Sequence, residues 1–311
     1  MKRSTILRHS VKFAFAIFLF LASAPDMTAQ DQPEQPAGKY PQVPVPNTEL
    51  RSFWSEILGQ EMYLYIKLPP SYYAKPQKTY LAWYITDANR SFPLVAGIAD
   101  FIDAGKTVDP ELLMIGIGYK IQDMSDFTAW RTRDLTPTSV FSIDSSQTRM
   151  LSDLSGRQID VTTGGAATFL EVIEKEVIPF AEANYRISSV NRGLGGYSYG
   201  GLFTLYALFT KPELFSIYYA GSPSIGYDKG VLFTYENEYA LTHKDLHARL
   251  FMTTGELEGA QMTANLNKMA DLLKSHNYPG LTVETHVFPG ENHASCVPSS
   301  VMRALRVLYN R

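Results

Sequence analysis

The chain has 311 residues, and its 28 Lys and Arg against 31 Asp and Glu give a formal net charge of −3. It holds no long basic tract, which argues against a nucleic-acid-binding protein or a protein that binds anionic membranes. Its single cysteine, Cys296, excludes a fold held together by internal disulfides.

The start of the chain, residues 1–29, is predicted to be a signal peptide. Lys2, Arg3 and Arg8 form a basic beginning, and residues 13–22 are an unbroken apolar run. This run is too short to span a bilayer and is flanked by small residues, which is typical of an export signal. A single transmembrane anchor is the alternative. Cleavage would release a secreted or periplasmic protein that has no stable membrane anchor.

The next stretch, residues 30–50, is predicted to be a proline-rich linker. Five prolines lie between residues 31 and 47, together with few residues that a core could bury. The remaining residues 51–311 suit one large α/β domain better than two small ones.

Strands and helices alternate along this domain. Apolar residues on both sides of Gly59 and Gln60 predict a β-hairpin over residues 53–58 and 61–68. Short apolar runs predict further strands at 80–86, 112–118, 192–197, 215–220, 250–254 and 281–288. Helices are predicted at 166–185, 202–210, 263–277 and 299–309. The pattern indicates a mostly parallel central sheet with helices on both faces and an antiparallel hairpin at its edge.

The segment GLGGYSYGGLF, residues 193–203, places Ser198 between Gly196 and Gly200. It joins a predicted strand to a predicted helix, which is the setting of a G-x-S-x-G nucleophile elbow. Glycines let the strand and the helix approach closely, and the helix N-terminus supplies free N–H groups to a developing oxyanion. Ser198 is therefore the predicted nucleophile, with an ordinary glycine-rich turn as the alternative.

A serine hydroxyl needs a base, and His293 has the right position for one. It lies in a loop after the last predicted strand, where α/β-hydrolases carry this histidine. His243 and His247 are four residues apart but have no third metal ligand beside them. We expect His276 at the surface and His286 within the last strand. No metal and no organic cofactor are expected.

The acid of the triad is expected just after the strand at 250–254. Glu256 and Glu258 both qualify by position, and the spacing from Gly255 favours Glu258, with Glu256 as the alternative. A carboxylate here would hold the imidazole in the required tautomer and stabilise its charged form.

The turn after the strand at 80–86 is the predicted oxyanion-hole loop. It carries Asp87, and the backbone N–H of Ala88 or Asn89 could act together with that of Tyr199.

Four segments resemble esterases of the α/β-hydrolase superfamily, in the group of the enterobactin and salmochelin trilactone esterases and their esterase D-like relatives. The segments are RTRDLTPT (131–138), the predicted helix with its flanks (164–187), the nucleophile segment (194–215) and GENHASCVPSSVMRALRVLY (290–309). The likeness runs from about Ser52 to Leu308. It implies an α/β-hydrolase fold and a serine esterase that cleaves a small-molecule ester through an acyl-enzyme.

Carried over residue by residue, the resemblance implies Ser198 as nucleophile, His293 as base and Glu258 as acid. It also implies that Arg131 grips a carbonyl or an anionic group of the substrate, with Asp87 nearby. The alternative for Arg131 is an ordinary salt bridge within the segment that it shares with Arg133 and Asp134.

The sequence departs from many of these relatives at two places that line their pocket. Residues 86–88 read Thr-Asp-Ala where relatives have Leu-Asp-Gly, and residues 225–227 read Ile-Gly-Tyr where relatives have bulky aromatic residues. These departures leave the ester open between a siderophore-type lactone, a feruloyl or acetyl carbohydrate ester and an acyl thioester. A non-catalytic ligand-binding protein on a hydrolase scaffold is the alternative from another class. The sequence does not indicate an oligomeric state.

Overall fold

The structure is a computed structural model, and it describes residues 43–105, 108 and 111–309. The predicted signal peptide and most of the predicted linker lie outside the described residues. From Val45 onward the chain forms one compact unit. Within the described part of the chain, no helix has the length and apolar character needed to cross a membrane.

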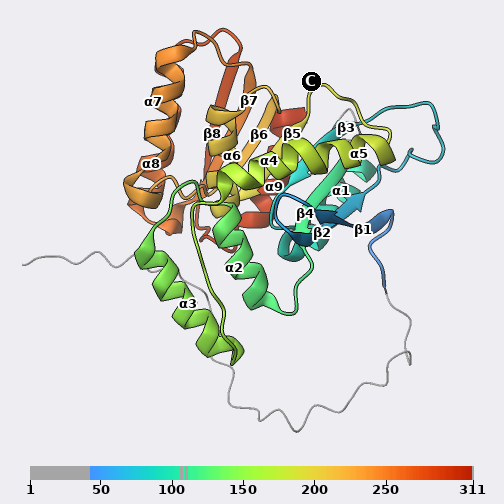
Figure 1. Cartoon of the computed structure of the whole chain (residues 1–311). Coiled ribbons are helices and arrows are strands. Elements are labelled where there is room, and N and C mark those ends of the chain that lie inside the picture. The colour runs from blue at the N-terminus through green and yellow to red at the C-terminus, as the bar shows by residue number, and fades with distance from the viewer. Residues whose placement is uncertain (1–42, 106–107, 109–110, 310–311) are drawn as a thin grey trace, which may run out of the picture. The chain divides into compact units, whose positions relative to one another are not determined.

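The described residues form a sheet of eight strands in the order β1-β2-β4-β3-β5-β6-β7-β8 (Figure 1). The strands are β1 (Thr48–Ser55), β2 (Gln60–Lys67), β3 (Leu81–Ile85), β4 (Leu112–Tyr119), β5 (Gly193–Tyr197), β6 (Ile217–Gly221), β7 (Ala248–Gly255) and β8 (Leu281–Phe288). β1 and β2 are antiparallel, as are β2 and β4, and all other neighbours are parallel. The mostly parallel sheet with an antiparallel hairpin at its N-terminal edge is therefore confirmed.

The predicted hairpin forms, but its turn covers residues 56–59 and not Gly59 and Gln60, because Gln60 already pairs with Ser55. Its register begins at the pair Ser55 and Gln60, and Gly59 adopts a left-handed φ of 64° in the turn. The carboxylate of Glu176 accepts hydrogen bonds from the Ser55 hydroxyl at 2.5 Å and from the Glu56 N–H at 2.9 Å. Glu176 belongs to a π turn in the predicted helix at 166–185, which ties this helix to the hairpin.

Helices cover both faces of the sheet, as predicted. They are α1 (Ala88–Gly105), α2 (Met124–Asp134), α3 (Phe141–Ser155), α4 (Ala166–Val172), the π turn η1 (Ile173–Val177), α5 (Ile178–Asn184), α6 (Tyr199–Thr210), α7 (Leu232–Thr242), α8 (Ala260–Ser275) and α9 (Cys296–Tyr309), with 3₁₀ turns η2 (Tyr227–Lys229) and η3 (Glu256–Glu258). Successive strand residues point to opposite faces. Trp83 thus joins a core with α1 and α9, whereas Tyr84 joins the larger core that includes α4, α6 and α8.

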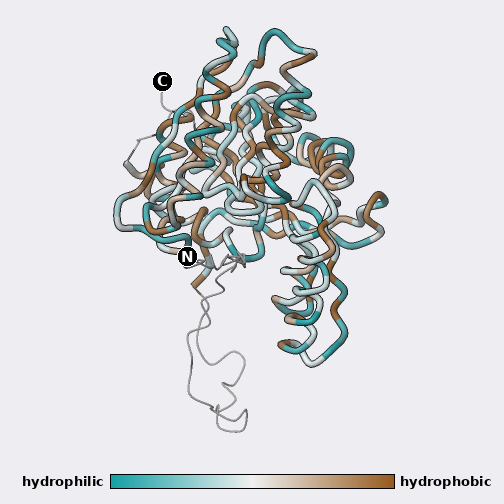
Figure 2. Tube along the Cα trace, turned by 90° about the vertical axis from the view of Figure 1, so that its left-hand side faces the viewer, coloured by the Kyte–Doolittle hydropathy of each residue, from teal (hydrophilic) through white to brown (hydrophobic). Residues whose placement is uncertain are grey.

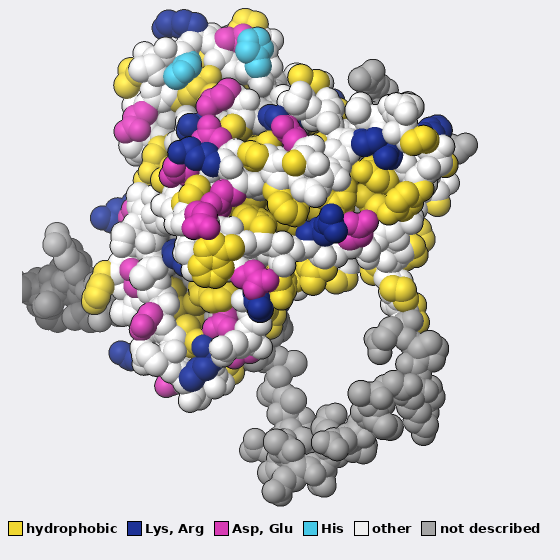
Figure 3. Space-filling view, turned by 45° about the vertical axis from the view of Figure 1, so that its right-hand side comes forward, with side chains coloured by type: hydrophobic (Ala, Val, Ile, Leu, Met, Phe, Trp, Pro, Cys, Tyr) yellow, Lys and Arg dark blue, Asp and Glu magenta, His cyan; other side chains and the backbone are white. Residues whose placement is uncertain are grey.

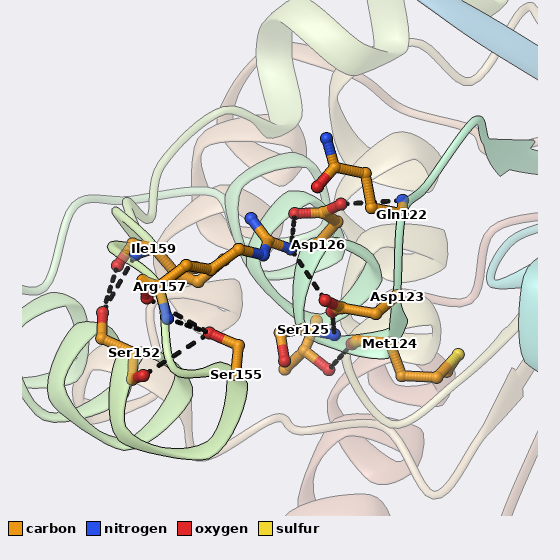
Figure 4. Close-up of polar contacts among 10 residues, drawn as sticks. Gln122, Asp123, Met124, Ser125, Asp126, Ser152, Ser155, Arg157 and Ile159 are labelled. Atoms are coloured by element: carbon orange, nitrogen blue, oxygen red, sulfur yellow. Dashed lines mark hydrogen bonds and ion pairs between the residues drawn. The ribbon is translucent and has the colours of Figure 1, made fainter.

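Sequence analysis assigned no helix to α1, α2, α3 or α7. α1 carries an apolar stripe that includes Phe92, Val95, Ala99 and Ile102, but Pro93 within it is unfavourable to a helix; α3 buries only Leu151 and has no such stripe. In Figures 1 and 2 the helices α2 and α3 form an arm that extends away from the sheet. Its polar side is fixed by Arg157, which donates to Asp126 at 2.5 Å and to Asp123 at 3.0 Å (Figure 4).

Charged side chains are mixed on the surface. On the face shown in Figure 3, Lys and Arg lie among Asp and Glu, and the described residues form no broad patch of one sign. This distribution agrees with the absence of a basic tract in the sequence.

Candidate active site

Ser198 occupies the turn between β5 and α6, as the motif predicts. Its φ of 61° and ψ of −115° lie outside the regions that a residue with a side chain normally adopts. Its N–H donates to the carbonyl of Gly221 at 2.9 Å, and its own carbonyl accepts from the N–H of Leu202 at 2.9 Å. The surrounding backbone therefore holds the serine in a strained conformation, as nucleophile elbows require.

The glycines on both sides of Ser198 permit this turn. A Cβ on Gly196 would overlap the backbone carbonyl of Gly200, and a Cβ on Gly200 would overlap the Thr86 hydroxyl. β5, α6 and the end of β3 consequently meet at a distance that only glycine allows. The G-x-S-x-G spacing is thus a packing requirement of this turn.

His293 and Glu258 form a pair at the same end of the sheet. His293 lies in the loop between β8 and α9, and its Nδ1 is 2.5 Å from Oε2 of Glu258. The Glu258 side chain is 2% exposed, whereas that of His293 is 49% exposed. The other candidate acid, Glu256, turns away and accepts a hydrogen bond from the Gly290 N–H at 2.8 Å. The structure therefore brings the favoured acid, and not the alternative, to the histidine.

The Glu258 carboxylate is held in its charged form. Burial by itself would raise its pKa, but hydrogen bonds from His293, the Ser222 hydroxyl and the Gly255 N–H outweigh burial and leave the pKa below its usual value. A carboxylate that is ionised at neutral pH can accept the Nδ1 hydrogen and leave Nε2 free as a base.

Tyr197, the residue that precedes Ser198, contacts His293 and so places the histidine beside the elbow. The rings of Tyr197 and His293 have centroids 5.1 Å apart, and the Tyr197 hydroxyl donates to the carbonyl of His293 at 2.9 Å. Among the described residues, no hydrogen bond joins the side chains of Ser198 and His293. Such bonds are often long before substrate binds.

The predicted oxyanion donors lie at two adjacent helix N-termini. Ala88 is the first residue of α1 and Tyr199 the first residue of α6, so neither N–H has an acceptor within its helix. The two N-termini are neighbours, because a Cβ on Gly200 would lie 3.2 Å from Oδ2 of Asp87. Asn89, the alternative donor, is the second residue of α1, so its backbone N–H also has no acceptor within the helix, while its side chain bonds both the N–H and the carbonyl of Tyr119 at 2.8 Å.

Arg131 and Asp87, the two residues expected near the substrate, bind each other. Arg131 donates from Nε to Oδ1 at 2.6 Å and from Nη2 to Oδ2 at 2.9 Å. Its guanidinium carbon is 5.4 Å from the centre of the Tyr199 ring. Arg133, not Arg131, forms the salt bridge with Asp134, at 2.6 Å. The salt bridge within this segment, which we gave as the alternative for Arg131, is thus made by Arg133 instead.

The other histidines lie away from the elbow. His243 stacks on the Tyr239 ring at 4.1 Å, and His286 lies in the edge strand β8. His276 is not simply at the surface, as we expected, because the buried carboxylate of Glu236 lies 2.6 Å from its Nε2. Within the described part of the chain, no cluster of three or more His, Cys, Asp or Glu could hold a metal ion.

Sequence analysis missed Ser222, which contacts the acid. Ser222 follows β6 with a φ of 36°, is fully buried, and has its Oγ 2.6 Å from Oε1 of Glu258. The one available signal was its position at the carboxyl end of a parallel strand beside the one that carries the elbow. Cys296, in contrast, is a buried residue of α9, and burial raises the pKa of its thiol to about 11.

The fold and this constellation define a serine hydrolase of the α/β-hydrolase class. A family model described as "Putative esterase" matches residues 145–295. Ferri-bacillibactin esterase BesA of Bacillus subtilis is 30% identical over 269 residues, which cover 84% of this chain and 89% of BesA. The siderophore triacetylfusarinine C esterase of Aspergillus fumigatus is 27% identical over 296 residues, covering 86% and 94%. The chain belongs to this esterase family.

A solved structure gives the same assignment of fold. The IroE-like serine hydrolase from Shewanella oneidensis has a TM-score of 0.69 and 26% identity, over 84% of this chain and 80% of that one. The predicted class, a serine esterase, is therefore confirmed.

Proposed function

We propose that this protein is an exported esterase that hydrolyses the ester bonds of a siderophore-type lactone through an acyl-enzyme on Ser198. The observation that carries the proposal is the strained Ser198 at the elbow beside His293, whose Nδ1 is held by the buried Glu258. The names of two relatives, ferri-bacillibactin esterase and triacetylfusarinine C esterase, support the substrate class.

In the first half of the reaction, Oγ of Ser198 attacks the ester carbonyl while Nε2 of His293 takes the hydroxyl proton. The N–H groups of Tyr199 and Ala88 donate to the oxyanion that forms on the carbonyl oxygen. His293 then returns the proton to the leaving alkoxide, which departs as the alcohol. The acyl group remains bonded to Oγ of Ser198.

In the second half, water attacks the acyl carbonyl and gives a proton to Nε2 of His293. The tetrahedral intermediate collapses, the C–O bond to Ser198 breaks, and His293 returns the proton to Oγ. The products are a carboxylic acid and the free enzyme, and the role of Glu258 throughout is to orient and stabilise the imidazolium.

The test is a substrate panel assayed on the purified protein. It contains p-nitrophenyl esters, a feruloyl ester, an acetylated sugar, an acyl thioester and a cyclic trilactone. We expect the trilactone to have the highest kcat/KM, and Ser198→Ala and His293→Ala each to lose nearly all turnover. Because triad members act as a unit, the double variant should be hardly worse than either single one. A fluorophosphonate probe should label the wild type and not Ser198→Ala.

Three outcomes would count against parts of the proposal. Full turnover in Ser198→Ala would remove this serine as the nucleophile. A preference for the feruloyl, acetyl or thioester substrate would replace the substrate class and keep the mechanism. Tight binding of esters without turnover by the wild type would indicate a binding protein on a hydrolase scaffold.

The export component rests on residues 1–29 and has its own measurement. Intact-mass analysis of the exported protein should place the mature N-terminus between Pro25 and Asp31. Retention of residues 1–24 in a membrane fraction would indicate an anchor instead.

A further inference from the structure

The Glu258 carboxylate has partners beyond His293. Oε2 faces Nδ1 of His293 at 2.5 Å, while Oε1 accepts from the Gly255 N–H at 2.7 Å and lies 2.6 Å from the Ser222 hydroxyl. Glu258 is the last residue of a 3₁₀ turn of three residues, and so short a turn by itself holds a side chain only weakly in place. Its orientation therefore depends on the groups that bind Oε1.

Ser222 is held in position at an energetic cost. It is fully buried and adopts a φ of 36°, in the left-handed region that a side chain disfavours. Its N–H donates to the carbonyl of Thr253 at 2.8 Å, so the strand beside it fixes its backbone. Backbone strain that the surroundings maintain tends to occur where a side chain must point in one direction.

Tyr197 connects this serine to the histidine loop, residues 289–295. Its hydroxyl lies 2.7 Å from the Ser222 Oγ and donates to the carbonyl of His293 at 2.9 Å. Burial and the nearby Glu258 carboxylate raise the pKa of this phenol, so it stays a hydrogen donor at every working pH. The end of β5, the end of β6, the acid and the histidine loop are thereby linked.

The hydrogen atoms available fix the direction of this network. Ser222 and Tyr197 each supply one hydrogen, and a carboxylate and a carbonyl can only accept. Ser222 therefore directs its hydrogen to the Glu258 carboxylate, because a charged acceptor forms the stronger bond, and Tyr197 donates to the His293 carbonyl. The 2.7 Å contact between the Ser222 and Tyr197 oxygens is left with no hydrogen of its own.

We propose that Ser222 and Tyr197 are positioning residues of the active site. Ser222 aims the Glu258 carboxylate at His293, and Tyr197 holds the loop that carries His293 against the elbow. This inference rests on the proposed function, because it assigns to both residues an effect on the base of that reaction. Neither side chain is assigned a contact with substrate.

The expected kinetic effect follows from the loss of one hydrogen bond to the acid. We expect Ser222→Ala to lower kcat about 10-fold and to change KM little, because it acts on the base and not on substrate binding. Tyr197→Phe keeps the ring beside His293 and should lower kcat about 3-fold, since only a neutral bond is lost.

The pH profile separates positioning from a structural role. Without the Ser222 hydroxyl, the pKa of Glu258 should rise toward its usual value, so the part of the kcat profile that reports protonation of Glu258 should move to higher pH. The other titratable groups that face Glu258 are Tyr197, Tyr219 and Cys296, and burial raises the pKa of each. These three groups therefore stay uncharged in the range where Glu258 titrates.

A second variant guards against a folding defect. Ser222→Gly removes the same hydroxyl, and glycine adopts a positive φ without steric cost. Its backbone should therefore be unstrained, whereas that of Ser222→Ala remains strained. The control is Tyr218→Phe, which removes a buried, hydrogen-bonded hydroxyl outside the Glu258 network. This control should keep the wild-type kcat per folded molecule and its pH profile.

Double variants test whether Ser222 acts through the acid. If it does, Ser222→Gly in the Glu258→Gln background should cause little further loss of kcat, although each change alone is damaging. Wild-type kcat and pH profile in Ser222→Gly, or multiplicative losses in the double variant, would overturn the inference. These results would still leave the proposed function intact, because that is tested separately by the turnover of Ser198→Ala and His293→Ala and by the substrate panel.

Discussion

The guanidinium of Arg131 binds the carboxylate of Asp87 at two points, with Nε 2.6 Å from Oδ1 and Nη2 2.9 Å from Oδ2. Asp87 directly precedes α1, and the same guanidinium lies over the ring of Tyr199, the first residue of α6. One side chain therefore contacts the beginnings of both helices whose N–H groups we assign to the oxyanion. The family resemblance implied that Arg131 grips the substrate, whereas in this structure Nε and Nη2 of Arg131 already donate to Asp87.

This geometry predicts that Arg131→Lys lowers kcat more than it raises KM. A lysine carries a point charge and cannot make the two-point pair, so the turn that carries the Ala88 N–H loses its support. We expect about a 10-fold loss of kcat, equivalent to about 1.4 kcal/mol of activation free energy. Steady-state kinetics on one neutral and one anionic ester would measure it.

Arg133→Lys is the matched control, because Arg133 makes the same kind of pair with Asp134. It should reduce stability and leave kcat per folded molecule unchanged. If Arg131→Lys instead raises KM for the anionic ester alone, the guanidinium binds substrate as the resemblance implies.

The two candidate acids should differ sharply when each is changed to glutamine. Glu258→Gln replaces the acceptor of the Nδ1 hydrogen with an amide that cannot balance an imidazolium charge, so kcat should fall with KM nearly unchanged. The loss should lie between about 10-fold and the roughly 10⁴-fold known for a buried triad acid. Glu256→Gln keeps an oxygen acceptor for the Gly290 N–H and should change kcat little. The reverse result would assign the acid to Glu256, and two active variants would indicate a Ser198–His293 dyad.

The triad could be predicted because each of its three residues follows a strand. Central strands of a parallel sheet are apolar on both faces, so they stand out in the sequence, and the site lies at their carboxyl ends. Ser198 follows β5, Glu258 follows β7 and His293 follows β8. These positions can therefore be predicted from local sequence patterns, without knowledge of the tertiary structure.

The pairing of side chains could not be predicted in the same way. Asp87 and Arg131 are separated by 44 positions, and Arg131 has Asp134 only three positions away. Which carboxylate it meets depends on how α2 packs against the sheet. α2 itself was missed because it is polar, and its buried residues are mostly polar and do not form an apolar stripe.

Asp103, in the last turn of α1, should make stability depend on pH. Burial raises its pKa to about 6, and Glu111 and Asp100 add to this while Lys67 and Lys78 oppose it. In the unfolded chain an aspartate has a pKa of about 3.9. The folded state thus binds the proton more tightly, so this stabilisation is complete below about pH 4 and is lost as the pH rises through 6.

Asp103→Asn removes this dependence. The free energy of unfolding of the variant minus that of the wild type should be larger at pH 7 than at pH 4, as measured by urea unfolding. Asp153→Asn, on the exposed side of α3, is the control. An Asp103→Asn variant with the wild-type pH dependence would show that Asp103 is ionised in the folded state across this range.

The last prediction concerns the elbow and compares alanine substitutions at two glycines. Gly196→Ala places a Cβ against the Gly200 carbonyl, which belongs to the backbone and cannot rotate away, so the protein should lose about 1–3 kcal/mol of stability. Gly97 lies inside α1 with open space around it, and Gly97→Ala should gain about 0.5–1 kcal/mol. Because Gly196 also sets the position of Ser198, its variant should react with a fluorophosphonate far more slowly, while the Gly97 variant keeps the wild-type rate. If Gly196→Ala is labelled at the wild-type rate, the nucleophile does not depend on the close approach of β5 and α6.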